Sequence, residues 1–156
     1  MNVTVMSRRD AIRYCRKPND ARTAIISISD PYMAYSDYPF ISKSNGVVGI
    51  LYLTFSDADG VGLPDVYGRP TMKEDLMSDD DAKKIAIFLR AHENDNIIVH
   101  CDAGISRSSG VTAAILKYKT GDDSSIFKNG RYCPNMWCYR KTLEALMREE
   151  ESNERF

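Results

Sequence analysis

The sequence has no long hydrophobic run, no excess of charge of either sign and few histidines. Its longest apolar stretch, Val47 to Phe55, is too short and too interrupted to cross a bilayer, which takes about 20 apolar residues. The formal net charge is −1, so no overall basic field points to nucleic acid or an anionic membrane as a partner. We therefore expect neither a membrane protein nor a nucleic-acid-binding protein.

Signals of secretion are also missing from the sequence. The first ten residues end in Arg8-Arg9-Asp10, and no apolar segment follows them as it would in a signal peptide. The cysteines do not have the spacing of a disulfide framework; they are Cys15, Cys101, Cys133 and Cys138. Free thiols are typical of a reducing compartment, so we expect a cytoplasmic protein.

Length and composition fit one ordinary globular domain. The chain has 156 residues, of which 43% are hydrophobic and 28% are charged. A chain of this size buries roughly 70% of the surface that its unfolded form exposes, so its core needs neither a metal nor a disulfide. No repeat, low-complexity tract or linker divides it. We expect a single domain over residues 1–156.

Hydrophobic patterning predicts strands that alternate with helices. The β-rich runs are residues 24–28, 47–55 and 97–100. Helical spacing or capping residues mark four segments, which are 7–17 (begun by Ser7 and ended before Pro18), 79–92, 107–119 and 135–147. The stretches 32–45 and 56–77 are expected to be loops. This alternation predicts an α/β fold, with a mainly parallel central sheet flanked by helices.

The segment His100 to Gly110, HCDAGISRSSG, lies between the last predicted strand and the helix that follows it. In α/β sheets, ligands bind at the carboxyl ends of strands, where a helix begins. Backbone N–H groups of this loop can converge on an anion; they belong to Asp102, Ala103, Gly104, Ile105 and Ser106. The guanidinium of Arg107 can grip two oxygens of that anion. The same donors favour the thiolate form of Cys101, and the hydroxyl of Ser108 lies within reach of it.

The pattern His-Cys-x-x-Gly-x-x-Arg-Ser resembles the active-site loop of the cysteine-dependent protein phosphatases. The chain looks like their small dual-specificity-like branch of bacterial and phage members, weakly over residues 25–31 and more clearly over 51–146. The resemblance implies that Cys101 forms a phosphocysteine and that Arg107 clamps the phosphoryl group. It also implies that Ser108 helps to cleave the phosphocysteine and that His100 orients the loop from behind.

The resemblance further implies a phosphorylated protein as substrate, with phosphotyrosine ahead of phosphoserine or phosphothreonine, and no metal or other cofactor. In similar enzymes an aspartate on a loop after an upstream strand protonates the leaving oxygen. Asp57 and Asp59 both follow the strand 47–55, and Asp65 lies further along the loop. Each could instead be an ordinary turn residue. We predict Asp57, because it is nearest the strand end, with Asp59 as the alternative.

Other interpretations of these residues remain open but are less favoured. Cys133 and Cys138 with His100 lack the spacing and the fourth ligand of a zinc site. A rhodanese-like sulfurtransferase also places a cysteine between a strand and a helix, but Arg107 and Ser108 suit phosphate better. A non-catalytic phosphopeptide-binding module would have lost the cysteine or the arginine, and both are present. The sequence gives no oligomeric state.

Overall fold

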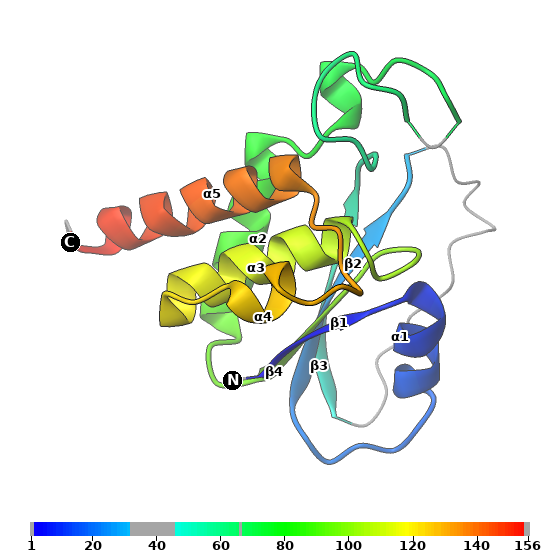
Figure 1. Ribbon diagram of the computed structural model, residues 1–156. Helices are drawn as coiled ribbons and strands as arrows, with labels where there is room; N and C mark the ends of the chain where they lie inside the picture. Colours follow the sequence, from blue (N-terminus) through cyan, green and yellow to red (C-terminus); the bar gives the residue numbers. More distant parts are fainter. Residues whose placement is uncertain (1, 32–45, 66, 155–156) are drawn as a thin grey trace.

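The computed structural model describes residues 2–31, 46–65 and 67–154 of the chain (Figure 1). Its strands are β1 (Val3–Met6), β2 (Thr23–Ser29), β3 (Val47–Thr54) and β4 (Asn96–His100). Its helices are α1 (Arg8–Cys15), the short 3-10 turn η2 (Lys73–Asp75), α2 (Asp79–Ala91), α3 (Arg107–Thr120), α4 (Ser124–Phe127) and α5 (Met136–Glu154). None of the helices in these ranges is both long and apolar enough to cross a membrane.

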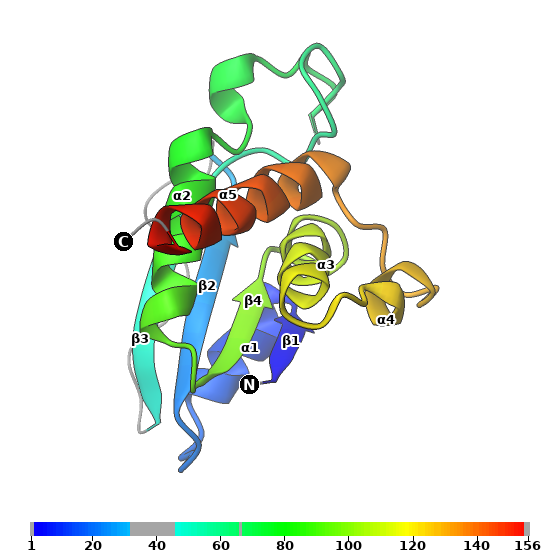
Figure 2. The same cartoon turned by 90° about the vertical axis from the view of Figure 1, so that its left-hand side faces the viewer.

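The strands form one parallel sheet in the order β1-β4-β2-β3. Figure 2 shows α2, α3 and α5 covering one face of this sheet, while α1 lies against the other. All seven residues of β2 are buried because this strand has a neighbour on either side and helices on both faces. A continuous apolar run of this kind is typical of a strand inside a parallel sheet.

Successive residues of the inner strands point into two different cores. Ile26 of β2 and Val99 of β4 pack with α2, α3 and α5 in the larger core. Ile25 and Ile98, one position away, pack with Ala11 and its neighbours on α1 in the smaller core. This alternation with period two fixes the register, since a slip by one residue would exchange the two faces. The predicted α/β fold with a parallel sheet flanked by helices is therefore confirmed.

Three elements were not predicted from the sequence. β1 has only four residues and gains its hydrogen bonds from β4, with Val3 opposite Ile97. The loop 56–77 contains η2, and α4 follows α3 after the left-handed Gly121.

The last helix continues to Glu154 instead of ending at 147. Short elements carry too little periodicity to be recognised locally, and the loop expected at 32–45 lies outside the described residues.

Because the sheet is parallel, the carboxyl ends of its strands meet at one edge. The residues that follow β2, β3 and β4 there are Asp30, Phe55 and Cys101. These positions are distant in sequence, yet the sheet brings them together in the place where α/β proteins bind ligands. This edge holds the candidate site.

Candidate active site

The loop from Cys101 to Ser106 joins β4 to α3, and Arg107 is the first residue of that helix. Gly104 adopts φ +72°, in the left-handed region that favours glycine. A Cβ on this residue would lie 2.6 Å from the backbone nitrogen of Ser7. The loop therefore passes so close to the chain between β1 and α1 that only glycine fits.

The thiol of Cys101 is buried at the start of this loop, where only 2% of the residue is exposed. Its Sγ lies 3.0 Å from Oγ of Ser108, which is on the first turn of α3 and fully buried. A serine hydroxyl at this distance donates to a thiolate. The structure thus brings together the two residues that the sequence pattern places seven positions apart.

Two hydrogen bonds hold the guanidinium of Arg107, and both are made by its Nη1. Its Nη1 donates to Oδ1 of Asp30 at 2.7 Å and to the carbonyl oxygen of Phe55 at 2.9 Å. The ion pair is mostly shielded from water, since 4% of the Arg107 side chain and 15% of the Asp30 side chain are exposed. Asp30 was not predicted as a site residue. Its position directly after a strand was the one signal that could have marked it.

The Nε of Arg107 has no hydrogen-bond partner within the described part of the chain, although it is buried. Buried nitrogen donors in folded proteins are nearly always paired, so a lone one requires a reason. The Nε–Nη2 edge of a guanidinium is planar and suits two oxygens of one phosphate or carboxylate. An oxyanion is therefore a fitting partner for this atom.

His100 lies behind the loop and is fully buried. Its Nδ1 is 3.0 Å from the carbonyl oxygen of Cys101, and its Nε2 is 2.7 Å from Oγ of Ser27, the residue opposite it on β2. Desolvation by burial lowers the pKa of His100 from 6.5 to about 4, so the ring is neutral at pH 7. A carbonyl only accepts, so Nδ1 carries the proton and Nε2 accepts from Ser27.

Asp57 lies beside the loop, and Oδ1 accepts both of its hydrogen bonds. Oγ of Ser106 donates at 2.8 Å, and Nδ2 of Asn135 donates at 2.9 Å. No other described residue is hydrogen-bonded to Oδ2 of this carboxyl group. The structure thus connects Asp57 to the loop itself.

Asp59 and Asp65 are engaged elsewhere. Oδ1 of Asp59 accepts from the backbone nitrogen of Met136 at 3.0 Å, at the start of α5. Asp65 accepts from the backbone nitrogens of Tyr67 and Arg69 in its own turn, and these bonds help to lower its pKa. A carboxylate that closes its own turn is a structural residue of the loop.

Comparisons with known proteins agree on one fold. No protein-family model and no curated protein matches the chain. Among solved structures, human DUSP28 matches with a TM-score of 0.59 at 14% identity, over 96% of this chain and 94% of that one. DUSP15 matches with a TM-score of 0.54 at 20% identity, over 99% and 92%. PTPMT1 in complex with PI(5)P matches with a TM-score of 0.52 at 15% identity, over 97% and 94%.

This chain has the fold of the cysteine-dependent protein tyrosine phosphatases. The predicted resemblance is confirmed at the level of the fold. Within this phosphatase fold, Cys101 lies in the loop between a strand and a helix, as predicted.

Two segments far away in the sequence brace the loop of the phosphatase fold. On one side the backbone nitrogen of Arg8 donates to the carbonyl of Asp102 at 3.0 Å, and its Nε is 3.4 Å from Oδ1 of Asp102. On the other side the backbone nitrogens of Cys133 and Asn135 donate to Ile105 and Ser106, each at 3.0 Å. These bracing roles of Arg8 and Asn135 were not predicted, because nothing in the local sequence shows contacts over such separations.

The described residues contain no group of three or more His, Cys, Asp or Glu side chains placed to hold a metal ion. Cys138 is buried in the main core and Cys133 is exposed. Burial raises the pKa of the Cys138 thiol well above its ordinary value. Cys138 therefore packs as a neutral apolar side chain.

Proposed function

We propose that this protein is a phosphomonoester hydrolase that removes phosphate from phosphoproteins, phosphotyrosine above all, through a phosphocysteine intermediate. One observation carries the proposal. A buried cysteine paired with a serine hydroxyl and an arginine with an unpartnered Nε lie at the two ends of the same strand-to-helix loop. A nucleophile and a planar clamp in this arrangement suit the phosphoryl group.

The first step transfers the phosphoryl group to the enzyme. The thiolate of Cys101 forms a bond to phosphorus while the bond from phosphorus to the substrate oxygen breaks. Asp57 gives its proton to the departing oxygen, and Oδ2 is the oxygen that carries this proton, because Oδ1 holds two donors. Arg107 and the N–H groups of residues 102–106 stabilise the charge on the phosphoryl oxygens.

The second step returns the enzyme to its starting state. Asp57 takes a proton from a water molecule, which forms a bond to phosphorus as the sulfur–phosphorus bond breaks. The hydroxyl of Ser108, 3.0 Å from Sγ, donates to the thiolate as it leaves. The products are inorganic phosphate and free Cys101. The cycle uses only groups of the chain and water.

A protein substrate is supported by the charge beside the nucleophile. Asp102 follows Cys101 directly, and 70% of its side chain is exposed. Although Oδ1 of this carboxylate lies 3.4 Å from Nε of Arg8, it disfavours a second phosphate placed directly beside the first, as in a compact polyphosphorylated headgroup. PTPMT1 has been solved with PI(5)P, so phosphoinositides belong in the same assay.

The test is hydrolysis of p-nitrophenyl phosphate by the wild type and by Cys101→Ser, with and without a chelator. We expect turnover by the wild type in both conditions. We expect no turnover by the variant, because a serine hydroxyl is not ionised near neutral pH. The variant should still bind vanadate. Activity that survives in Cys101→Ser would overturn the mechanism, and thiosulfate-to-cyanide sulfur transfer without phosphate release would favour a sulfurtransferase.

A further inference from the structure

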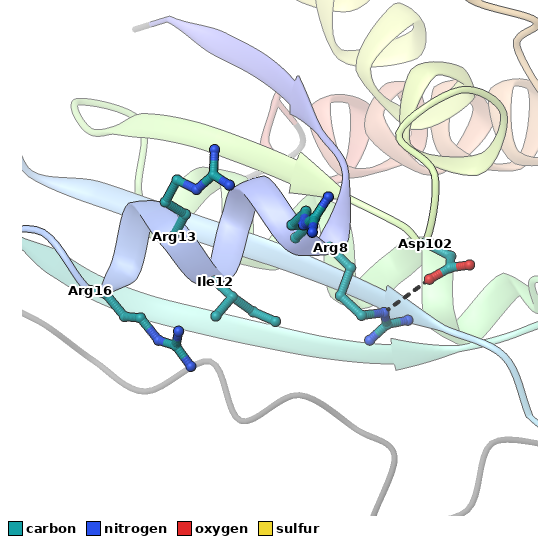
Figure 3. A pocket seen from close by; sticks show the side chains of 6 residues that line it. Arg8, Ile12, Arg13, Arg16 and Asp102 are labelled. Atoms are coloured by element: carbon teal, nitrogen blue, oxygen red, sulfur yellow. Dashed lines mark hydrogen bonds and ion pairs between the residues drawn. The ribbon is translucent and has the colours of Figure 1, made fainter.

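Helix α1 carries an unusual number of positive charges beside the catalytic loop. A groove of about 490 Å³ is lined by Arg8, Arg9, Ile12, Arg13, Arg16 and Asp102. Figure 3 shows this groove, with Arg8 directed at Asp102 and Arg13 and Arg16 further along the helix. Asp102 also belongs to the loop that follows Cys101, so the groove begins where the proposed phosphate site ends.

The arginines of this groove fall into two kinds. Arg8 is buried, and it holds Asp102, Oγ of Ser29 and the carbonyl of Ile28, so it belongs to the fold. Arg9, Arg13 and Arg16 are exposed, and no residue in the described ranges forms a hydrogen bond or ion pair with their guanidinium groups. Within the described part of the chain, the guanidinium groups of this second set are therefore exposed and unpaired.

The charge of Arg9 does not favour the folded helix, whereas that of Arg13, in the last turn, does. Arg9 lies in the first turn of α1, where the helix dipole disfavours a positive charge. Arg9 and Arg13 are four residues apart, a spacing at which like charges repel each other. The whole chain has a net charge of −1, so the excess is local. A charge cluster that has no hydrogen-bond or ion-pair partner among residues 2–31, 46–65 and 67–154 favours recognition of an anion.

We propose that the α1 groove binds a second anionic side chain, carboxylate or phosphate, of a phosphopeptide whose phosphotyrosine occupies the loop at Cys101. The proposal rests on the proposed phosphatase function and names the kind of peptide that it favours. Arg9, Arg13 and Arg16 supply the charge, and half-buried Ile12 supplies an apolar surface on the side of α1 that also carries Arg16 (Figure 3).

The shape of the cluster favours a peptide over a lipid headgroup. Arg9 and Arg16 are seven residues apart, which corresponds to about 10 Å along a helix. An extended peptide covers this length with about three residues. A compact headgroup would have to place its charges together, next to the exposed carboxylate of Asp102. Charges that are spread along the helix, away from the loop, suit an acidic segment of peptide better than one compact headgroup.

The experiment compares two phosphotyrosine peptides that differ only in having glutamate or glutamine at the positions flanking the phosphotyrosine. The variants are Arg13→Gln/Arg16→Gln and a charge-matched control, Lys83→Gln/Lys128→Gln. Lys83 lies on α2, on the other face of the sheet, and Lys128 follows α4. Vesicles that contain a singly phosphorylated phosphoinositide form a third substrate, and p-nitrophenyl phosphate is the reference.

For the wild type we expect kcat/KM to be about tenfold higher for the glutamate peptide than for the glutamine peptide, mainly through KM. The preference should shrink at high salt, because exposed charges are screened. Arg13→Gln/Arg16→Gln should lose most of the preference for the glutamate peptide, and Lys83→Gln/Lys128→Gln should keep this preference. A preference that survives in the first variant, or a loss confined to the vesicle substrate, would overturn the proposal. Failure to hydrolyse p-nitrophenyl phosphate at all would instead reject the proposed function.

Discussion

At the scale of single residues, the candidate site depends on how the guanidinium of Arg107 is held in position. Arg107 could adopt many rotamers, yet one carboxylate and one carbonyl fix its Nη1. This leaves Nε, on the opposite edge of the guanidinium, without a partner among the residues that the structure describes. In the proposed mechanism Asp30 is therefore a positioning residue, since it acts on the phosphoryl group through Arg107.

The change Asp30→Asn tests this positioning. It keeps the shape and one acceptor oxygen but removes the charge that orients the guanidinium. We expect kcat for p-nitrophenyl phosphate to fall by about 10- to 100-fold, a loss typical of a misplaced catalytic group. In an Arg107→Ala background the same change should have little further effect. Equal, additive losses in the two backgrounds would show that Asp30 acts independently of Arg107.

The choice between Asp57 and Asp59 is also decided by single residues. We expect Asp57→Asn to lower kcat by about 10² to 10⁴ for an aryl phosphate with a poor leaving group. The loss should be much smaller for an aryl phosphate whose leaving group needs no proton. Asp59→Asn should change kcat for the two aryl phosphates by the same factor, because the carboxylate of Asp59 caps the start of α5. If Asp59→Asn alone discriminates between the substrates, the acid is Asp59.

At the scale of elements, the loop 101–106 depends on the segment that leads into α5. Asn135 accepts from the backbone nitrogen of Cys138 as the cap of α5, and it donates to Asp57 and to the carbonyl of Ala58. Its own backbone nitrogen is bonded to Ser106. Asn135 thus connects the start of α5, the segment of Asp57 and Ala58, and the loop 101–106.

Two cap substitutions separate stability from function. Asn135→Ala and Ser78→Ala each remove the cap of a long helix, α5 and α2 respectively. Each should lower the free energy of unfolding by about 1–2 kcal/mol in a denaturant titration. Only Asn135→Ala should also lower kcat, by more than tenfold, because Ser78 has no contact with the loop. Equal kcat values in the two variants would contradict the link through Asn135.

At the scale of the whole molecule, the buried edge of the sheet makes stability depend on pH. His100 has a pKa of about 4 in the folded protein, against 6.5 in its ordinary state. The unfolded chain therefore binds a proton first as the pH falls. The folded state loses stability between pH 6.5 and 4, by about 3 kcal/mol when the loss is complete.

The comparison of wild type with His100→Gln isolates this contribution. Carboxylates titrate in the same range in both proteins, so their effect cancels in the difference. We expect the free energy of unfolding to fall more steeply for the wild type than for His100→Gln from pH 7 to pH 4. The difference between the two unfolding free energies should change by about 3 kcal/mol over this range. Parallel pH profiles for the two proteins would mean that His100 is not held in its neutral form.

The sequence alone determined the features that depend on neighbours in the chain. A cysteine and an arginine at the ends of a loop between strand 97–100 and helix 107–119 are visible locally, and so is the apolar run of β3. The positions of Asp57 and Ser108 follow from their distances to a strand end and to a cysteine. Local hydrogen bonding and side-chain periodicity suffice for such features.

Only the tertiary structure decided which distant residues complete the site. Arg8 and Asp102 are 94 positions apart, Asp30 and Arg107 are 77 apart, and Asp57 and Asn135 are 78 apart. A parallel sheet places the carboxyl ends of its strands at one edge, whatever their order in the chain. The four-residue strand β1 forms because β4 offers it a partner. Pairing of this kind depends on the packed sheet, which no local stretch of sequence contains.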